Sequence, residues 1–141
     1  MDAPVEVRPY SERLRFQDFG FERLPNGSCR ARVVLSWSDG REFVGEAEGV
    51  ISEQGELRCA AEACVRALER VVRPKLGFEI VGVKAVRAFD AMVVIVSLTA
   101  RTEGSVSRLV GSYLAEKNPT QGAALAVLNA TNRMLGNYYA R

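Results

Sequence analysis

Few side chains in this chain could perform chemistry, and histidine is absent altogether. Without histidine, the Ser-His and Cys-His pairs that activate many nucleophiles cannot form. A pair of carboxylates remains, and Glu46 and Glu48 are the candidates because they lie two residues apart. That spacing puts both side chains on one face of an extended strand, where glutamates are ordinarily solvated surface. We therefore expect no catalytic residues and no enzymatic activity.

The thiols give no stronger indication of a reactive or metal-binding site. Cys29, Cys59 and Cys64 are three in number, and an odd count argues against a disulfide framework. The chain has neither histidine nor a Cys-x-x-Cys pair, so the usual zinc ligands are missing. Both glycine-rich nucleotide-binding motifs are absent as well. The cysteines are therefore expected to be small buried residues, with no metal and no cofactor.

Three glycines within expected strands are candidates for a binding or interface site. Gly45, Gly49 and Gly111 each weaken a strand, and glycine in such a place marks a close approach of backbone or ligand. A helix packed tightly on the sheet would explain them, and so would a ligand or a dimer contact. Both explanations remain open at the sequence level.

Polar residues in the last expected helix form the second set of candidates. Asn129, Asn132 and Arg133 interrupt its alanine-rich sequence. They are either exposed surface or polar contacts to an anionic ligand or across an interface. Trp37 and Tyr113 could line such a site, although Trp37 also fits the core.

Composition places the chain among ordinary globular domains. Its 141 residues are 48% hydrophobic and 26% charged, with a net charge of +2, which is enough for a single domain with its own core. The small positive charge does not indicate nucleic acid or an acidic membrane surface. No apolar run is long enough to cross a bilayer, and the first residues lack the features of a signal peptide. We expect a cytoplasmic protein that does not associate with membranes.

An internal repeat organises the sequence. The pattern Ala-Ala-x-Ala-x-x-x-Ala occurs at residues 60–67 and again at 123–130. Each copy follows a Val-Gly pair, at 44–45 and 110–111, and further upstream a Val-Val pair, at 33–34 and 93–94. The shared order indicates a duplicated strand-strand-helix element.

Residue patterns then extend the repeat to three strands and a helix. We expect a flexible tail at residues 1–10, followed by one domain at 11–141 that contains repeats at about 11–74 and 75–137. In the first repeat, Leu14 and Phe16 alternate in one phase and Phe19 and Phe21 in the other, which predicts a strand at 13–24 with a bulge near Asp18. A short helix that starts at Ser11 is the alternative.

The remaining elements follow from alternation, helical spacing and breakers. A hairpin is expected around Asp39-Gly40, a pair that tolerates a type I′ turn. Asn118 is the expected cap of the last helix, and Gly136-Asn137 is expected to end it. The expected strands are 30–37, 42–50, 78–89, 91–101 and 108–114, and the expected helices are 56–73 and 119–135.

The short connections between strands predict antiparallel pairing. The expected fold is therefore α+β, with duplicated β-β-β-α units and two helices on one face of an antiparallel sheet. Alanine-rich helices allow close approach, which favours a homo-oligomer.

Tandem β-β-β-α units across residues 13–136 resemble the C-terminal regulatory domain of 2-isopropylmalate synthase. That family has a glycine-rich segment before an alanine-rich helix, which corresponds here to Gly45, Gly49 and Gly111. The resemblance implies a small-molecule-sensing regulatory domain that binds leucine and pairs with a second copy. The expected partners are therefore a small effector, another protein, or a second copy of the chain.

A second resemblance covers residues 56–135. Their α-β-β-β-α order is similar to that of double-stranded-RNA-binding domains, which hold phosphates with lysines at the start of the last helix. Only Lys117 stands at that point. Nucleic-acid binding is therefore the alternative function, and it has the weaker electrostatic support.

Overall fold

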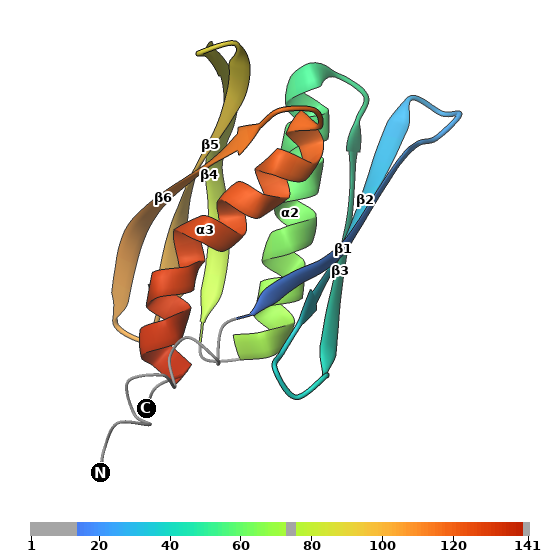
Figure 1. Ribbon diagram of the computed structural model, residues 1–141. Helices are drawn as coiled ribbons and strands as arrows, with labels where there is room; N and C mark the ends of the chain where they lie inside the picture. The colour runs from blue at the N-terminus through green and yellow to red at the C-terminus, as the bar shows by residue number, and fades with distance from the viewer. Residues whose placement is uncertain (1–13, 73–75, 140–141) are drawn as a thin grey trace.

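Six strands and two helices follow one another as two β-β-β-α units in a computed structural model (Figure 1). The structure describes residues 14–72 and 76–139, with only the backbone for residues 133 and 135–139. The tail expected at residues 1–10 lies outside this part. The elements are β1 (Arg15–Arg23), β2 (Ser28–Ser36), β3 (Glu42–Val50), α2 (Glu53–Val72), β4 (Gly77–Ala88), β5 (Ala91–Thr102), β6 (Ser105–Ala115) and α3 (Pro119–Tyr139).

The strands form two antiparallel sheets rather than one continuous sheet. The first sheet has the order β1-β2-β3 and the second the order β4-β5-β6. Helices α2 and α3 pack against each other, α2 on β2 and β3, and α3 on β5 and β6. Figure 1 shows both helices between the two sheets. The α+β class and the repeated β-β-β-α units expected from the sequence are confirmed.

The two repeats agree down to irregularities in their strands. The pairing of β1 with β2 shifts register between Phe16 and Asp18, and the pairing of β4 with β5 shifts between Ile80 and Gly82. Each bulge therefore falls in the first strand of its unit. The expected bulge near Asp18 is confirmed, and the alternative of a helix starting at Ser11 does not fit β1 from Arg15 onward.

Helix α2 forms the centre of the core, because it contacts β2, β3, β4 and α3. Its buried face is built mainly from alanine, valine and cysteine, with Leu57 and Leu68 as the largest side chains. Small residues allow the helix to lie close to elements on several sides at once. Neither helix in the described part of the chain is long and apolar enough to span a bilayer.

Turn geometry differs from the expectation at the β2–β3 hairpin, and the type I′ turn lies instead at the β4–β5 hairpin. At the β2–β3 hairpin Gly40 has a positive φ of 94° whereas Asp39 does not, so the turn is not type I′. The β4–β5 hairpin instead has positive φ at both Phe89 and Asp90, 53° and 62°, as a type I′ turn requires. Glycine normally marks that turn, so its absence hid the turn type in the sequence.

Both helices extend beyond the expected bounds. Helix α2 begins at Glu53, because the Ser52 hydroxyl accepts a hydrogen bond from the backbone N–H of Gly55 at 2.9 Å and so acts as an N-cap. Helix α3 continues through Gly136 to Tyr139, so the expected end at Gly136-Asn137 was wrong. Glycine in a helix lowers stability without terminating the helix outright.

The three cysteines are buried and free, as the sequence indicated. The Sγ of Cys59 lies 3.2 Å from the carbonyl oxygen of Ala47. Burial, followed by the neighbouring Cys29, raises the pKa of the Cys59 thiol from 9.0 to about 12. Burial also raises the pKa of the Cys64 thiol strongly. Neither thiol is therefore a ready nucleophile at neutral pH.

These raised pKa values predict a loss of stability in alkali. In the unfolded chain the thiols ionise near pH 9, whereas in the folded protein they stay protonated to higher pH. Their contribution is thus present below pH 9.0 and is lost as pH rises toward about 12. We expect urea unfolding to show a lower free energy at about pH 10.5 than at about pH 8. Cys64→Ala should reduce that difference, and an unchanged difference would contradict the assignment.

Candidate functional site

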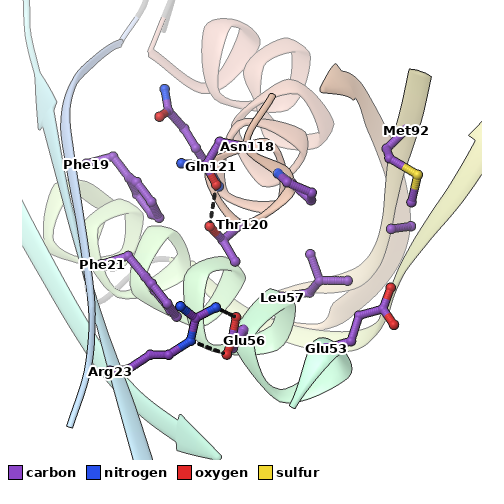
Figure 2. Close-up of a pocket in the computed structure, with 12 residues that line it drawn as sticks. Phe19, Phe21, Arg23, Glu53, Glu56, Leu57, Met92, Asn118, Thr120 and Gln121 are labelled. Carbon is purple, nitrogen blue, oxygen red and sulfur yellow. Dashed lines mark hydrogen bonds and ion pairs between the residues drawn. The ribbon is translucent and has the colours of Figure 1, made fainter. Parts of the chain in front are cut away.

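A cavity of about 520 Å³ lies where the two repeats meet, and we call it the junction cavity. Figure 2 shows β1 on one side, β5 on the other, and the first turns of α2 and α3 between them. Its volume falls within the range of small-molecule sites. The lining residues are Phe19, Phe21, Arg23, Glu53, Glu56, Leu57, Ala85, Met92, Asn118, Pro119, Thr120 and Gln121.

The cavity exists because equivalent positions of the two repeats differ in size. Phe21 pairs with Ala31 on β2, and Ala85 pairs with Val94 on β5, so both occupy the same place in their units. Both line the junction cavity. A phenyl ring on one side therefore faces a methyl group on the other, and the missing volume leaves the space open. Met92 contributes a flexible apolar side chain to the same wall.

A bidentate ion pair sits in the cavity wall. Arg23 donates from Nε to Glu56 Oε2 at 2.9 Å and from Nη2 to Oε1 at 3.0 Å. The Glu56 side chain is 11% exposed, whereas that of Arg23 is 64% exposed. The hydrogen bond and charge of Glu56 raise the pKa of the Arg23 guanidinium, so this charge persists at any physiological pH. The pair thus presents fixed charges of both signs beside an apolar wall.

The N-termini of both helices open toward this cavity. Asn118 Oδ1 accepts hydrogen bonds from the backbone N–H of Gln121 at 3.3 Å and from the Thr120 hydroxyl at 2.6 Å, which confirms the expected cap and the start at Pro119. Gln121 and Thr120 line the cavity themselves. The amide and hydroxyl groups supply several donors and acceptors near the apolar surface.

The predicted glycines lie elsewhere, beneath the helices. A Cβ on Gly45 would meet the backbone of α2 at Ala63 and Ala67, and one on Gly111 would meet α3 at Ala126 and Ala130. A Cβ on Gly49 would lie 3.1 Å from that of Cys59. Close helix packing, one of the two explanations offered by the sequence, therefore accounts for all three positions, and none of them lines the junction cavity.

The predicted polar residues of α3 do not line the cavity either. Asn129 donates from Nδ2 to the carbonyl oxygen of Ser112 on β6 at 2.8 Å. Arg66 makes the equivalent contact in the first repeat, from Nη1 to the carbonyl oxygen of Glu46 at 2.7 Å. Asn129 thus ties its helix to its sheet. Asn132 is half-buried, and the side chain of Arg133 lies outside the described part.

The two glutamates considered for chemistry are engaged in ion pairs on the first sheet. Glu48 Oε2 lies 2.9 Å from Arg30 Nη2, and Glu46 Oε2 lies 3.6 Å from Arg32 Nε. Each carboxylate faces its own arginine. Within residues 14–72 and 76–139, the structure shows no cluster of three acidic, cysteine or histidine side chains that could hold a metal ion.

The structure therefore defines an α+β domain of two β-β-β-α units with one amphipathic cavity at their junction. No family model matches the chain, and no curated protein is similar enough to it to count as a relative. The functional conclusion consequently rests on the residues and geometry of the molecule itself.

Proposed function

We propose that the domain is a non-catalytic binding module that takes a small amphipathic molecule into the junction cavity. The observation that carries this proposal is the combination of an apolar wall, a fixed Arg23–Glu56 pair and the polar start of α3 around one space of about 520 Å³. Ligand sites typically combine an apolar lining with polar groups that fix orientation, and this cavity has equal numbers of apolar and polar lining residues. The three free thiols also fit a reducing compartment such as the cytoplasm.

The arrangement favours a ligand with an apolar body and charged groups at one end. Phe19, Phe21 and Met92 would contact the apolar body. The Glu56 oxygens keep further lone pairs that suit an ammonium group, and Nη1 of Arg23, which takes no part in the pair with Glu56, suits a carboxylate. A free amino acid has this chemistry, and it is the ligand class to test first. A ligand in this cavity would contact both repeats and would therefore bind only the folded protein. Such binding would stabilise the protein, and it could regulate an attached partner by shifting its conformation.

Thermal unfolding with amino acids, short carboxylic acids and nucleotides tests the proposal. A bound ligand at 100 times its Kd is expected to raise the free energy of unfolding by about 2.7 kcal/mol. Ala85→Trp would place an indole in the cavity and should abolish that gain while the unliganded protein still melts cooperatively. Ser107→Trp is the matched control, because Ser107 is exposed on β6 and does not line the cavity.

Two results would contradict the proposal. One is the absence of stabilisation by every compound in the three classes. The other is an equal gain in the wild type and in Ala85→Trp, which would place binding elsewhere. Double-stranded RNA belongs in the same screen. Binding that weakens steeply with salt would support the nucleic-acid alternative instead.

A further inference from the structure

The outer faces of the two sheets, turned away from the helices, differ sharply in chemistry. On the first sheet, Glu22, Arg30 and Glu48 form one row across the three strands, and Arg30 lies 3.3 Å from Glu22 and 2.9 Å from Glu48. The neighbouring row contains the Arg32–Glu46 pair. Charged ladders of this kind favour a sheet face that remains in water.

The equivalent rows of the second sheet have lost almost all of these charges. Val86, Val93 and Leu114 stand in register where the first sheet has Glu22, Arg30 and Glu48. Ile95 takes the place of Arg32, and Ser112 that of Glu46. The next row is Gly82, Ser97 and Val110. Exposure is 52% for Leu114, 63% for Val110, 38% for Val86 and 37% for Ile95.

The first sheet serves as a reference for the second, because the two units share one fold but have different residues on their outer faces. Both units have the same strands, the same bulge and the same helix packing. The first sheet has charges in two of the three rows and Asp18, Val34 and Val44 in the third, so the fold itself does not require apolar residues in the other two rows. A contiguous exposed apolar surface is unusual on a monomer and commonly marks an interaction site. We call the three rows of the second sheet the apolar face, and we propose that it binds the same face of a second copy of this chain.

Charge and position favour a second copy as the occupant. Lys84 is the charged residue in these rows, and it lies beside Ile95 at the β4 edge. The centre of the face therefore carries no charge, and a partner surface must also be uncharged at its centre. A two-fold axis along β5 would place Lys84 opposite Ser112 of the second copy and Val86 opposite its Leu114. Apolar residues then meet apolar residues, and the two lysines stay apart.

The size of the face indicates whether a dimer would be obligate or reversible. A three-stranded sheet with strands of 11 or 12 residues covers roughly 14 Å by 36 Å. Face-to-face packing along the full length of the strands would bury about 500 Å² on each copy, near the lower limit for a biological interface, and the three rows of the apolar face cover about half of that length. We therefore expect a reversible dimer with a Kd in the micromolar range, the weak end for protein interfaces, rather than an obligate one. The dimer does not require a ligand in the junction cavity.

Sedimentation equilibrium at concentrations from about 1 to 500 μM, on both sides of that Kd, tests the inference on the full chain. The wild type should change from monomer to dimer, and added NaCl should not dissociate the dimer, because burial of apolar surface is not screened. Ile95→Arg should raise the Kd at least about 100-fold, because a charge would be buried in the interface.

Two variants keep the test decisive. The double variant Ile95→Arg/Ser112→Glu reproduces the Arg32–Glu46 pair of the first repeat, so it should fold and remain monomeric. Arg32→Ile changes the equivalent position of the first sheet and should leave dimerisation unchanged or strengthen it. A wild type that stays monomeric throughout would overturn the inference, and so would a double variant that dimerises normally.

Discussion

Replacing Gly45 with valine is expected to lower the free energy of unfolding by about 3–5 kcal/mol, a large part of the roughly 5–15 kcal/mol that stabilises a typical domain. A Cβ at this position would collide with the carbonyl oxygen of Ala63 and the amide nitrogen of Ala67. Both are backbone atoms of α2, which is held on its other sides by β4 and α3. The helix therefore cannot move aside without disturbing the junction of the repeats.

Gly20→Val is the control for that experiment. Gly20 also lies in a strand of the first sheet, but a Cβ there would meet no atom within 4 Å. Valine has a higher strand propensity than glycine, so this variant should be neutral or slightly stabilised. Urea unfolding of both variants measures the difference directly. Equal stabilities for Gly45→Val and Gly20→Val would contradict the close packing of α2 on β3.

The sequence predicted the repeat because its signals are local. Alanines at helical spacing, alternating strands and the Val-Gly pairs are each read from a few neighbouring residues. Gly45 and Gly111 belong to the same set, since each packs beneath an alanine stripe of its own unit. These features did not depend on how one unit lies against the other.

The junction cavity could not be read in this way. Phe21 and Ala85 come from different units, and nothing local to either residue shows that they face one space. Glu56 and Arg23 belong to the same unit, but they are 33 residues apart, so no local pattern shows that they pair. The one available signal was comparative: where the repeats are aligned, an aromatic residue in the first corresponds to alanine in the second.

The same comparison shows that the glycine in one strand–helix contact changes sides between the two repeats. This exchange predicts a second large effect of a substitution on stability. In the first repeat, Gly49 on the strand faces Cys59 on the helix, and a Cβ added to Gly49 would lie 3.1 Å from the Cβ of Cys59. In the second repeat the roles are reversed, because Gly122 is on the helix and a Cβ added there would lie 3.0 Å from the Cβ of Ala115 on the strand. One member of the contact is glycine in each unit. Close packing at this point therefore tolerates one side chain but not two.

Gly122→Cys is accordingly expected to lower the free energy of unfolding by about 2–3 kcal/mol. The new Cβ would lie 3.0 Å from the Cβ of Ala115 and 3.2 Å from Cγ2 of Val94. A higher helix propensity than that of glycine offsets only a few tenths of a kcal/mol of this loss. Urea unfolding at pH 7, where the thiol is protonated, measures the effect.

Whether Gly122→Cys lowers or raises the free energy of unfolding depends on the residues that face it on the strands. In a Val94→Ala/Ala115→Gly chain, the second repeat acquires the small residues that stand at Ala31 and Gly49 in the first. Gly122→Cys should then fill the space and raise the free energy of unfolding relative to that background. The change in free energy of unfolding caused by Gly122→Cys should differ between the two chains by at least about 2 kcal/mol. This difference is the coupling energy between the helix position and the strand positions. An identical loss in both backgrounds would show that the strand and helix positions do not share one contact, and the equivalence of the two repeats would fail at this position.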